Sequence, residues 1–273
     1  MLGSSINIRL GIWLDDLRLG LKDALKSAGA LHPEIIGIDA FSAELSPRSL
    51  SGTGRRDLAQ NIRGKGMTLA VMRADLGGRR LTDSKLLDAN LTRIREAVQL
   101  CADTGARNLV VPAGYVPPKN DKDGATARST LAEAARVLAG LASTGGVRIC
   151  WTSGSEAPEV LAEFLNEADS SGLLEAEFHP GAFVMRGVDP LKALNALAAR
   201  VSMARAVDHY QGGAEAPFGK GDVRWGEVLV GLSTLRRSAP IEMLTGCTLE
   251  GDRLLAAATA YKRLVALRKN PMG

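Results

Sequence analysis

The stretch DSKLLDANLTRIREAVQLCADTGARNLVVPA, residues 83–113, contains one complete repeat of the pattern that decides the fold. Its first part has apolar residues at helical spacing, and residues 107–113 form a short apolar run typical of a buried strand. Gly105 lies between the two parts, where a left-handed residue commonly ends a helix. Residues 83–113 therefore predict a helix followed by a strand.

The same alternation of strand and helix occurs along the whole chain. A strand reaches a parallel neighbour only by a crossover, usually a helix, so repeated units of this kind predict a parallel sheet. Eight units in 273 residues match the size of a (β/α)8 TIM barrel, which we expect as a single domain over residues 1–273. The expected strands are residues 6–12, 34–40, 67–73, 107–113, 147–152, 173–179, 200–207 and 239–244.

An open doubly wound sheet is the alternative architecture. It would need a glycine loop that holds phosphate after an early strand, and WLDDLRLGLKD at 13–23 has no G-x-G-x-x-G pattern. In a barrel, the segments 42–56, 115–127 and 209–222 would follow the carboxyl ends of strands, the face on which barrel active sites lie. These three segments are therefore candidate loops that cover a ligand.

Charge and composition exclude several classes of protein. The 34 basic and 30 acidic residues are mixed along the chain without a run of five like charges, so we expect no nucleic-acid partner. Cys101, Cys150 and Cys247 each lie beside apolar residues, as reduced thiols do in a cytoplasmic protein. The chain shows neither an export signal nor a long apolar span, so we expect a cytoplasmic protein without a membrane partner.

Four stretches of the chain together resemble a known family in their order and spacing. They are RADLGGRRLTDSKLLDANLTRIREAVQLCADTGARNLVVPAG at 73–114, TSGSEAPEVLAEFL, FHPGAFVMRGVDPLKAL at 178–194 and DHYQGGAEAPFGKGDVRW at 208–225. In their order and spacing, the chain resembles the xylose-isomerase-like barrels of the sugar phosphate isomerase and epimerase superfamily. The resemblance implies a role in carbohydrate metabolism. It also implies a divalent metal at the carboxyl ends of the strands, held by Glu, Asp, His and Glu.

The positions that match these four metal ligands depart from the pattern at three places. The first Glu falls on Thr152, or on Trp151 if the strand is shifted by one residue, and the Asp falls on His179. The His falls on Arg205, or on Met203 in another register. The last position, Glu242, keeps the family residue. An arginine cannot lose its proton to become a ligand. We therefore expect no metal at the family position and no other cofactor. A divalent Mn, Mg, Co or Zn ion near Glu242 and His179 is the alternative.

For catalysis, the resemblance points to His179 and Glu242 as acid and base. A half-buried structural histidine is the alternative for His179. Arg205 interrupts an apolar strand, and we expect it either to grip a substrate carboxylate or phosphate or to form an ion pair with Glu242 or Glu177. A pair between Arg205 and Glu242 across the barrel mouth would fill the space left by the metal.

Other residues are candidates for binding the substrate. Asp208 matches an acidic family position, although a cap within its loop is the commoner role for Asp at a strand end. Aromatic side chains can stack on a sugar ring, and the alternative role for them is core packing. Lys220 would supply a cation from a loop, or lie solvated there. The complete set of expected substrate-binding residues is Arg205, Asp208, Trp151, Thr152, Trp13, Tyr115 and Lys220.

Two functions follow as hypotheses. The first is an isomerase or epimerase that acts by proton transfer on a small polyhydroxylated or sugar-acid molecule, which makes a carbohydrate-like ligand the expected partner. The second is a barrel without catalysis that serves as a binding or partner subunit, and a homo-oligomer is an open alternative in either case. Three histidines are too few for the metal cluster of a related phosphodiesterase that acts on damaged DNA.

Overall fold

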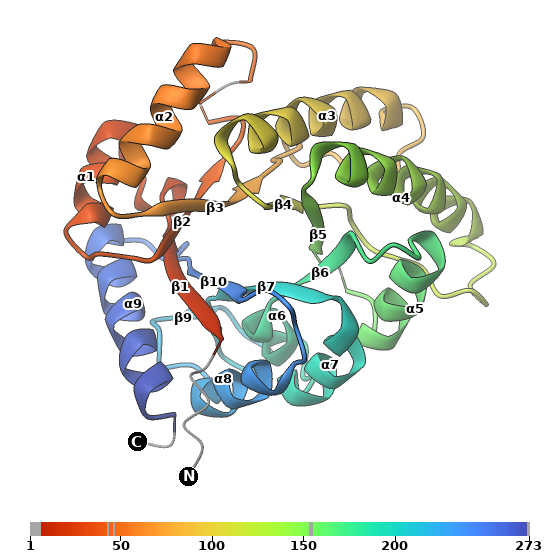
Figure 1. The fold of residues 1–273 in the computed structure, drawn as a ribbon. Helices are drawn as coiled ribbons and strands as arrows, with labels where there is room; N and C mark the ends of the chain where they lie inside the picture. Colours follow the sequence, from red (N-terminus) through yellow and green to blue (C-terminus); the bar gives the residue numbers. More distant parts are fainter. Residues whose placement is uncertain (1–6, 43, 46, 153–154, 272–273) are drawn as a thin grey trace. The chain divides into compact units, whose positions relative to one another are not determined.

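The computed structural model describes residues 7–42, 44–45, 47–152 and 155–271. All eight expected strands are present, and each bound lies within two residues of the prediction, although residue 6 lies outside the described part. The strand order β1-β10-β7-β6-β5-β4-β3-β2 is that of a closed parallel barrel, which confirms the expected (β/α)8 fold (Figure 1). The strands are β1 (Ile8–Trp13), β2 (Ile35–Asp39), β3 (Thr68–Arg73), β4 (Asn108–Val111), β5 (Arg148–Thr152), β6 (Leu174–Phe178), β7 (Val201–Ala206) and β10 (Ile241–Thr245).

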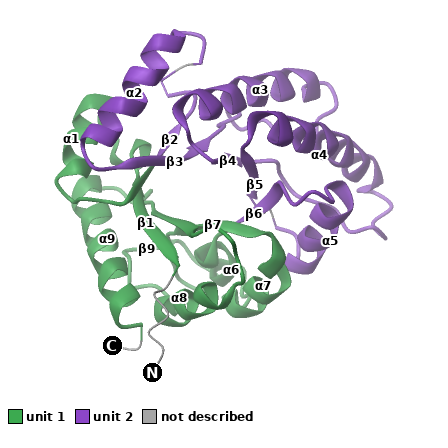
Figure 2. Cartoon of the chain, viewed as in Figure 1, with its two compact units in different colours: residues 1–36, 178–273 green, residues 37–177 purple. Residues whose placement is uncertain are grey.

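The chain divides into two compact units, which Figure 2 shows in different colours. Unit 1 contains residues 1–36 and 178–273, and unit 2 contains residues 37–177. The expected single domain over residues 1–273 stays a prediction. Within the described residues, the search for a helix both long and apolar enough to cross a membrane found none.

Unit 1 is built on the parallel strands β1, β10 and β7, which pair side by side. Gly11 in β1 is required by packing, because a Cβ there would lie 2.1 Å from the carbonyl oxygen of Ile35. The helices of unit 1 are α1 (Leu21–Gly29), α6 (Pro180–Met185), α7 (Pro190–Leu197), α8 (Trp225–Thr234) and α9 (Arg253–Lys269), with the 3-10 turns η1 (Asp15–Leu17) and η2 (Ala198–Arg200).

A short antiparallel hairpin of unit 1 was not predicted. Strand β8 (Asp208–His209) pairs with β9 (Glu215–Ala216) inside the segment 209–222 that we expected to be a loop. Each strand has only two residues, which is too short for a period of two to show in the sequence. The hairpin fixes the chain directly after β7, where candidate site residues lie.

Unit 2 contains four helices that follow its strands. They are α2 (Gly52–Gly64), α3 (Leu87–Thr104), α4 (Ala125–Gly145) and α5 (Pro158–Ala168). Helices α3 and α4 end at the left-handed Gly105 and Gly146, with φ of 84° and 62°. The expected loops 42–56 and 115–127 include the first residues of α2 and α4, and residues 43 and 46 lie outside the described part.

The two faces of β5 have different partners within unit 2. Trp151 is buried against Phe164 of α5, with ring centroids 5.4 Å apart in an edge-on arrangement. Since side chains alternate along a strand, Arg148, Cys150 and Thr152 lie on the other face, away from the helix. This alternation makes Trp151 a residue of the packing between strand and helix, and leaves Thr152 for the polar face.

Candidate functional site

The polar face of β5 and β6 carries a buried carboxylate near the carboxyl end of both strands. The strand register pairs Thr152 with Glu177, and the Thr152 hydroxyl donates to Oε2 of Glu177 at 2.6 Å. Glu177 is 0% exposed. Two residues nearer the start of β6, Glu175 forms an ion pair of 3.5 Å with Arg148. A buried carboxylate needs such hydrogen-bonding or charged partners, because its charge has left water.

A pocket of about 410 Å³ opens beside Thr152 in unit 2. Its lining comes from the segments that follow β3, β4 and β5, so it lies at the carboxyl ends of these strands. We call it the Tyr115 pocket, and its lining residues are Asp75, Gly78, Arg79, Arg80, Pro112, Gly114, Tyr115, Thr152 and Ser155. The structure thus brings together two of the expected substrate-binding residues, Tyr115 and Thr152. Trp151 packs against Phe164 of α5, and its expected role in substrate binding stays a prediction.

A second charged pair lies at the ends of β2 and β3 in unit 2. Nε of Arg73 lies 3.2 Å from Oδ2 of Asp39, and both side chains are largely buried. The other oxygen of Asp39 accepts the N–H of Phe41 at 2.9 Å. These contacts balance the charge of Asp39 and hold the turn after β2.

In unit 1, two histidines lie close together after β6 and β7. The ring centroids of His179 and His209 are 5.7 Å apart, with the rings edge to face. Gly181 permits this approach, because a Cβ there would lie 2.6 Å from Nδ1 of His209. That nitrogen is buried and makes no hydrogen bond to any described residue. His209 was not among the expected site residues, although the pair Asp208-His209 directly after an apolar strand was a visible signal.

Arg205 and Trp13 are also brought together in unit 1. The guanidinium carbon of Arg205 lies 5.6 Å from the ring centre of Trp13, which is fully buried. This distance is typical of a cation over an aromatic face. Trp13 therefore supports the Arg205 side chain.

Glu242 lies nearer the start of its strand than Arg205 does. It is the second residue of β10 and pairs in register with Met203, while Arg205 pairs with Leu244. Its carboxylate lies 3.2 Å from Nη1 of Arg9, the register partner on β1. The sequence did not predict this ion pair with Arg9, and the expected pair of Glu242 with Arg205 stays a prediction.

Asp208 has a structural role in the loop that follows β8 and β9. Its carboxylate is 1% exposed and accepts four backbone N–H groups, from His209, Gly219, Gly221 and Val223, at 2.8–3.3 Å. This arrangement is the loop cap that the sequence offered as the alternative, and the expected contact of Asp208 to substrate stays a prediction. Lys220 is exposed on the same loop and lines, with Asp208, a pocket of about 300 Å³.

The donors at the matching positions do not fit the divalent metal that the family resemblance implies. The Thr152 hydroxyl donates to Glu177, Arg205 carries a permanent positive charge, and Glu242 is paired with Arg9. A divalent cation of this type prefers several carboxylate oxygens with one imidazole. Across the described ranges, no group of three or more His, Cys, Asp or Glu side chains is placed to hold a metal.

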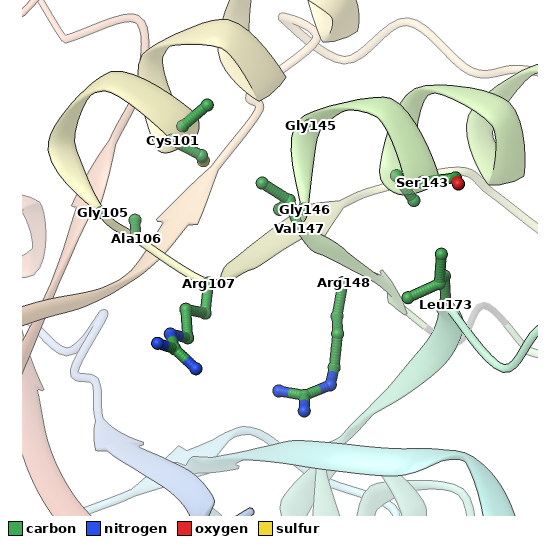
Figure 3. Close-up of a pocket in the computed structure, with 12 residues that line it drawn as sticks. Cys101, Gly105, Ala106, Arg107, Ser143, Gly145, Gly146, Val147, Arg148 and Leu173 are labelled. Atoms are coloured by element: carbon green, nitrogen blue, oxygen red, sulfur yellow. The ribbon is translucent and has the colours of Figure 1, made fainter.

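Unit 2 has another pocket of similar size, about 420 Å³, at the opposite ends of β4 and β5. We call it the Cys101 pocket, since it lies where α3 and α4 end (Figure 3). Burial raises the pKa of the Cys101 thiol, which makes the thiol unreactive. Figure 3 shows the side chains of Arg107 and Arg148 extending away from Cys101. Active sites of such barrels lie at the carboxyl ends of the strands, so this pocket is not the candidate site.

Comparisons with known proteins agree with this architecture. A family model described as xylose isomerase-like TIM barrel matches residues 23–241. No curated protein sequence matches the chain significantly. A xylose isomerase domain protein from Planctomyces limnophilus is 19% identical, with a TM-score of 0.82 over 96% of this chain and 98% of its own.

Two further solved structures share the fold. A D-tagatose 3-epimerase-like protein is 14% identical, with a TM-score of 0.78 over 97% of this chain and 100% of its own. The 3-keto-D-glucoside 4-epimerase of E. coli is 13% identical, with a TM-score of 0.74 over 95% of this chain and 99% of its own. Identities this low support only the shared fold. The match to the family model over most of the chain carries the assignment: this chain belongs to the xylose isomerase-like TIM barrel family.

Proposed function

We propose that the protein is an isomerase or epimerase that acts on a small polyhydroxylated or sugar-acid substrate by proton transfer, without the divalent metal of the family. The observation that carries this proposal is Glu177. It is fully buried near the carboxyl end of β6, and it accepts the hydroxyl of Thr152, which lines the Tyr115 pocket. A carboxylate in such a position is suited to accept a proton from carbon.

The chemistry requires one base and one acid. The carboxylate of Glu177 takes the proton from the carbon next to a substrate carbonyl, and the electron pair moves to the carbonyl oxygen as an enediolate. Return of a proton to the opposite face of the same carbon gives the epimer. Return to the neighbouring carbon gives the isomer, provided that the hydroxyl proton moves from the adjacent oxygen to the former carbonyl oxygen. His179 stays a proposed proton-transfer residue, and the ring of His209 lies beside it.

Glu242 does not take part in this proposal, because it is paired with Arg9 near the start of its strand. Arg205 stays a proposed substrate-binding residue, and its guanidinium lies over the ring of Trp13. We assign no metal to the protein. Its cytoplasmic location and its assembly into a homo-oligomer are also proposals.

The test is exchange of substrate hydrogen for deuterium in D2O, measured by mass spectrometry on a panel of ketoses, aldoses and sugar acids. Exchange reports proton abstraction whether or not the net reaction is favourable. We expect exchange by the chelator-treated protein, and a loss of about 100- to 10,000-fold in E177Q. The matched control is E175Q, on the same strand and the same face, which should keep the exchange rate of the folded protein.

The alternative function is a binding or partner subunit without catalysis. The observation that favours it is the departure of Thr152, His179 and Arg205 from the family ligands. Absence of exchange with the whole panel, before and after addition of Mn, Mg, Co or Zn, would support this alternative. Exchange that appears only with added metal would overturn the metal-free mechanism.

A further inference from the structure

The Tyr115 pocket carries an excess of positive charge at the carboxyl ends of the strands. Among the described residues of its lining, two guanidinium groups, from Arg79 and Arg80, accompany one carboxylate, that of Asp75. One oxygen of Asp75 already accepts the N–H of Gly77 at 2.9 Å. The same lining includes the hydroxyl groups of Tyr115, Thr152 and Ser155. Such a set of donors is complementary to an anion that also carries hydroxyl groups.

Three contacts hold the backbone and the aliphatic stem of Arg80. Its carbonyl oxygen accepts Nδ2 of the fully buried Asn90 at 3.2 Å, and the next N–H, of Leu81, donates to Ala113 at 3.2 Å. Its aliphatic stem packs beside Gly114, where a Cβ would lie 3.5 Å from the Cβ and Cδ of Arg80. The guanidinium itself makes no hydrogen bond or ion pair with the described part of the chain, so the anchored stem presents an available donor fork.

Arg79 is held by a different contact. Its Nε donates to the carbonyl oxygen of Leu76 at 2.8 Å, across the turn made by Gly77 and Gly78. Both glycines have positive φ, of 62° and 76°, which closes the turn and places Arg79 and Arg80 in succession at the pocket. The terminal nitrogens of Arg79 are donors that this contact does not use.

We propose that the Tyr115 pocket binds the anionic end of the substrate, a carboxylate or a phosphate, between Arg79 and Arg80. The inference rests on the proposed function and narrows its substrate class to a polyhydroxylated acid or a sugar phosphate. Arg80 is the main specificity residue, because its stem is anchored while its guanidinium forms a bidentate fork for oxygen pairs. Tyr115, whose side chain is 37% exposed, covers the entrance and binds the hydroxyl-bearing carbon next to the anion.

The test is calorimetric titration of the full chain with D-gluconate, ribose 5-phosphate, inorganic phosphate and the neutral sugar D-fructose. We expect gluconate or ribose 5-phosphate to bind at least 10-fold more tightly than fructose, with binding that weakens as salt rises. The two anions distinguish a carboxylate from a phosphate substrate. Equal or tighter binding of the neutral sugar would overturn the proposal.

The variants locate the binding. R80A should weaken anion binding by about 10- to 100-fold, and R80K, which keeps the charge but lacks the fork, should be intermediate. The matched control is R107A in the Cys101 pocket, which should bind as the wild type does. Unchanged affinity in both R79A and R80A, or equal loss in R107A, would overturn the proposal.

The failure of this inference is separate from failure of the proposed function. Deuterium exchange into neutral sugars without anion binding would leave the function standing and remove the anion pocket. Binding of an anion that depends on Arg80, without exchange in any compound, would keep the pocket and remove the catalytic proposal.

Discussion

The two pockets of unit 2 have nearly the same volume and two lining arginines each, yet we assign them different roles. The Tyr115 pocket has about 410 Å³ and the Cys101 pocket about 420 Å³. In the Cys101 pocket, Arg148 is neutralised by Glu175, and the carbonyl ends of α3 and α4 disfavour an anion. In the Tyr115 pocket, two arginines face one carboxylate. Charge balance and helix polarity therefore distinguish the Tyr115 pocket from the Cys101 pocket, whereas volume does not.

The largest expected effect is on stability at the Cys101 pocket. R148A would remove the cation that lies 3.5 Å from the carboxylate of Glu175, whose side chain is 3% exposed. Loss of one member of a buried ion pair should lower the free energy of unfolding by about 3 kcal/mol. R80A, an exposed substitution, should change it by less than about 0.5 kcal/mol.

Urea unfolding followed by circular dichroism measures both values. We expect R148A to lose stability and R80A to lose anion binding. A stability loss in R80A as large as that in R148A would make Arg80 a structural residue and contradict the different roles of the two pockets.

The second expected effect distinguishes Gly114, in the lining of the Tyr115 pocket, from Gly146, in the lining of the Cys101 pocket. Gly114 has φ of 100° and lies beside the stem of Arg80, whereas Gly146 has φ of 62° and nothing within 4 Å of an added Cβ. Alanine at either position should cost about 1–2 kcal/mol of backbone strain. Only G114A should also weaken anion binding. The strained backbone at residue 114 would relax by moving the loop, and this movement would displace the stem of Arg80. Thermal unfolding and titration with gluconate measure the two losses, and equal binding by both variants would contradict this expectation.

The smallest effect concerns Asp169, which holds the chain at the Leu173 edge of the Cys101 pocket. Burial alone would raise its pKa, but hydrogen bonds from Ser171, Leu174 and Leu173 bring the pKa below its usual value of 3.8. A lowered folded pKa means that its stabilisation is complete above about pH 5 and is lost as the pH falls through the folded pKa. D169N should cost about 1 kcal/mol at neutral pH and flatten the loss of stability below pH 4.

Denaturant titrations from pH 7 to pH 2 provide the measurement, and D75N in the Tyr115 pocket serves as the control. An unchanged pH slope in D169N would show that another carboxylate carries the acid sensitivity of the unit.

The fold was predictable because each strand is a short apolar run between helices of clear period. The register within the barrel was not predictable to the same degree. Strand β10 pairs Glu242 in register with Arg9 of β1, and the two side chains form an ion pair of 3.2 Å. Such a pair depends on which strands are neighbours and on their register, and the sequence of a single strand specifies neither.

The candidate site was only partly predictable for a related reason. Thr152 and Trp151 are neighbours in the sequence, and alternation shows that they face opposite sides but not which side holds the helix. Glu177 was not selected as a site residue because it lies inside the run LLEAEF, where the buried strand was the dominant signal. Its spacing of two from Glu175 was the only sign of a polar face.

The four N–H groups around Asp208 have a consequence for how this barrel can change over evolution. All four are main-chain donors, so the carboxylate fixes the path of residues 217–223 without reading most of their side chains. Gly221 must remain, since a Cβ there would lie 2.4 Å from Oδ1 of Asp208. Lys220 beside it is exposed, whereas the carboxylate of Asp222 accepts the N–H of Gln211 at 2.8 Å. The carboxylate of Asp208 therefore holds the shape of this loop through main-chain donors, so most side chains of the loop can change in evolution while its shape is kept.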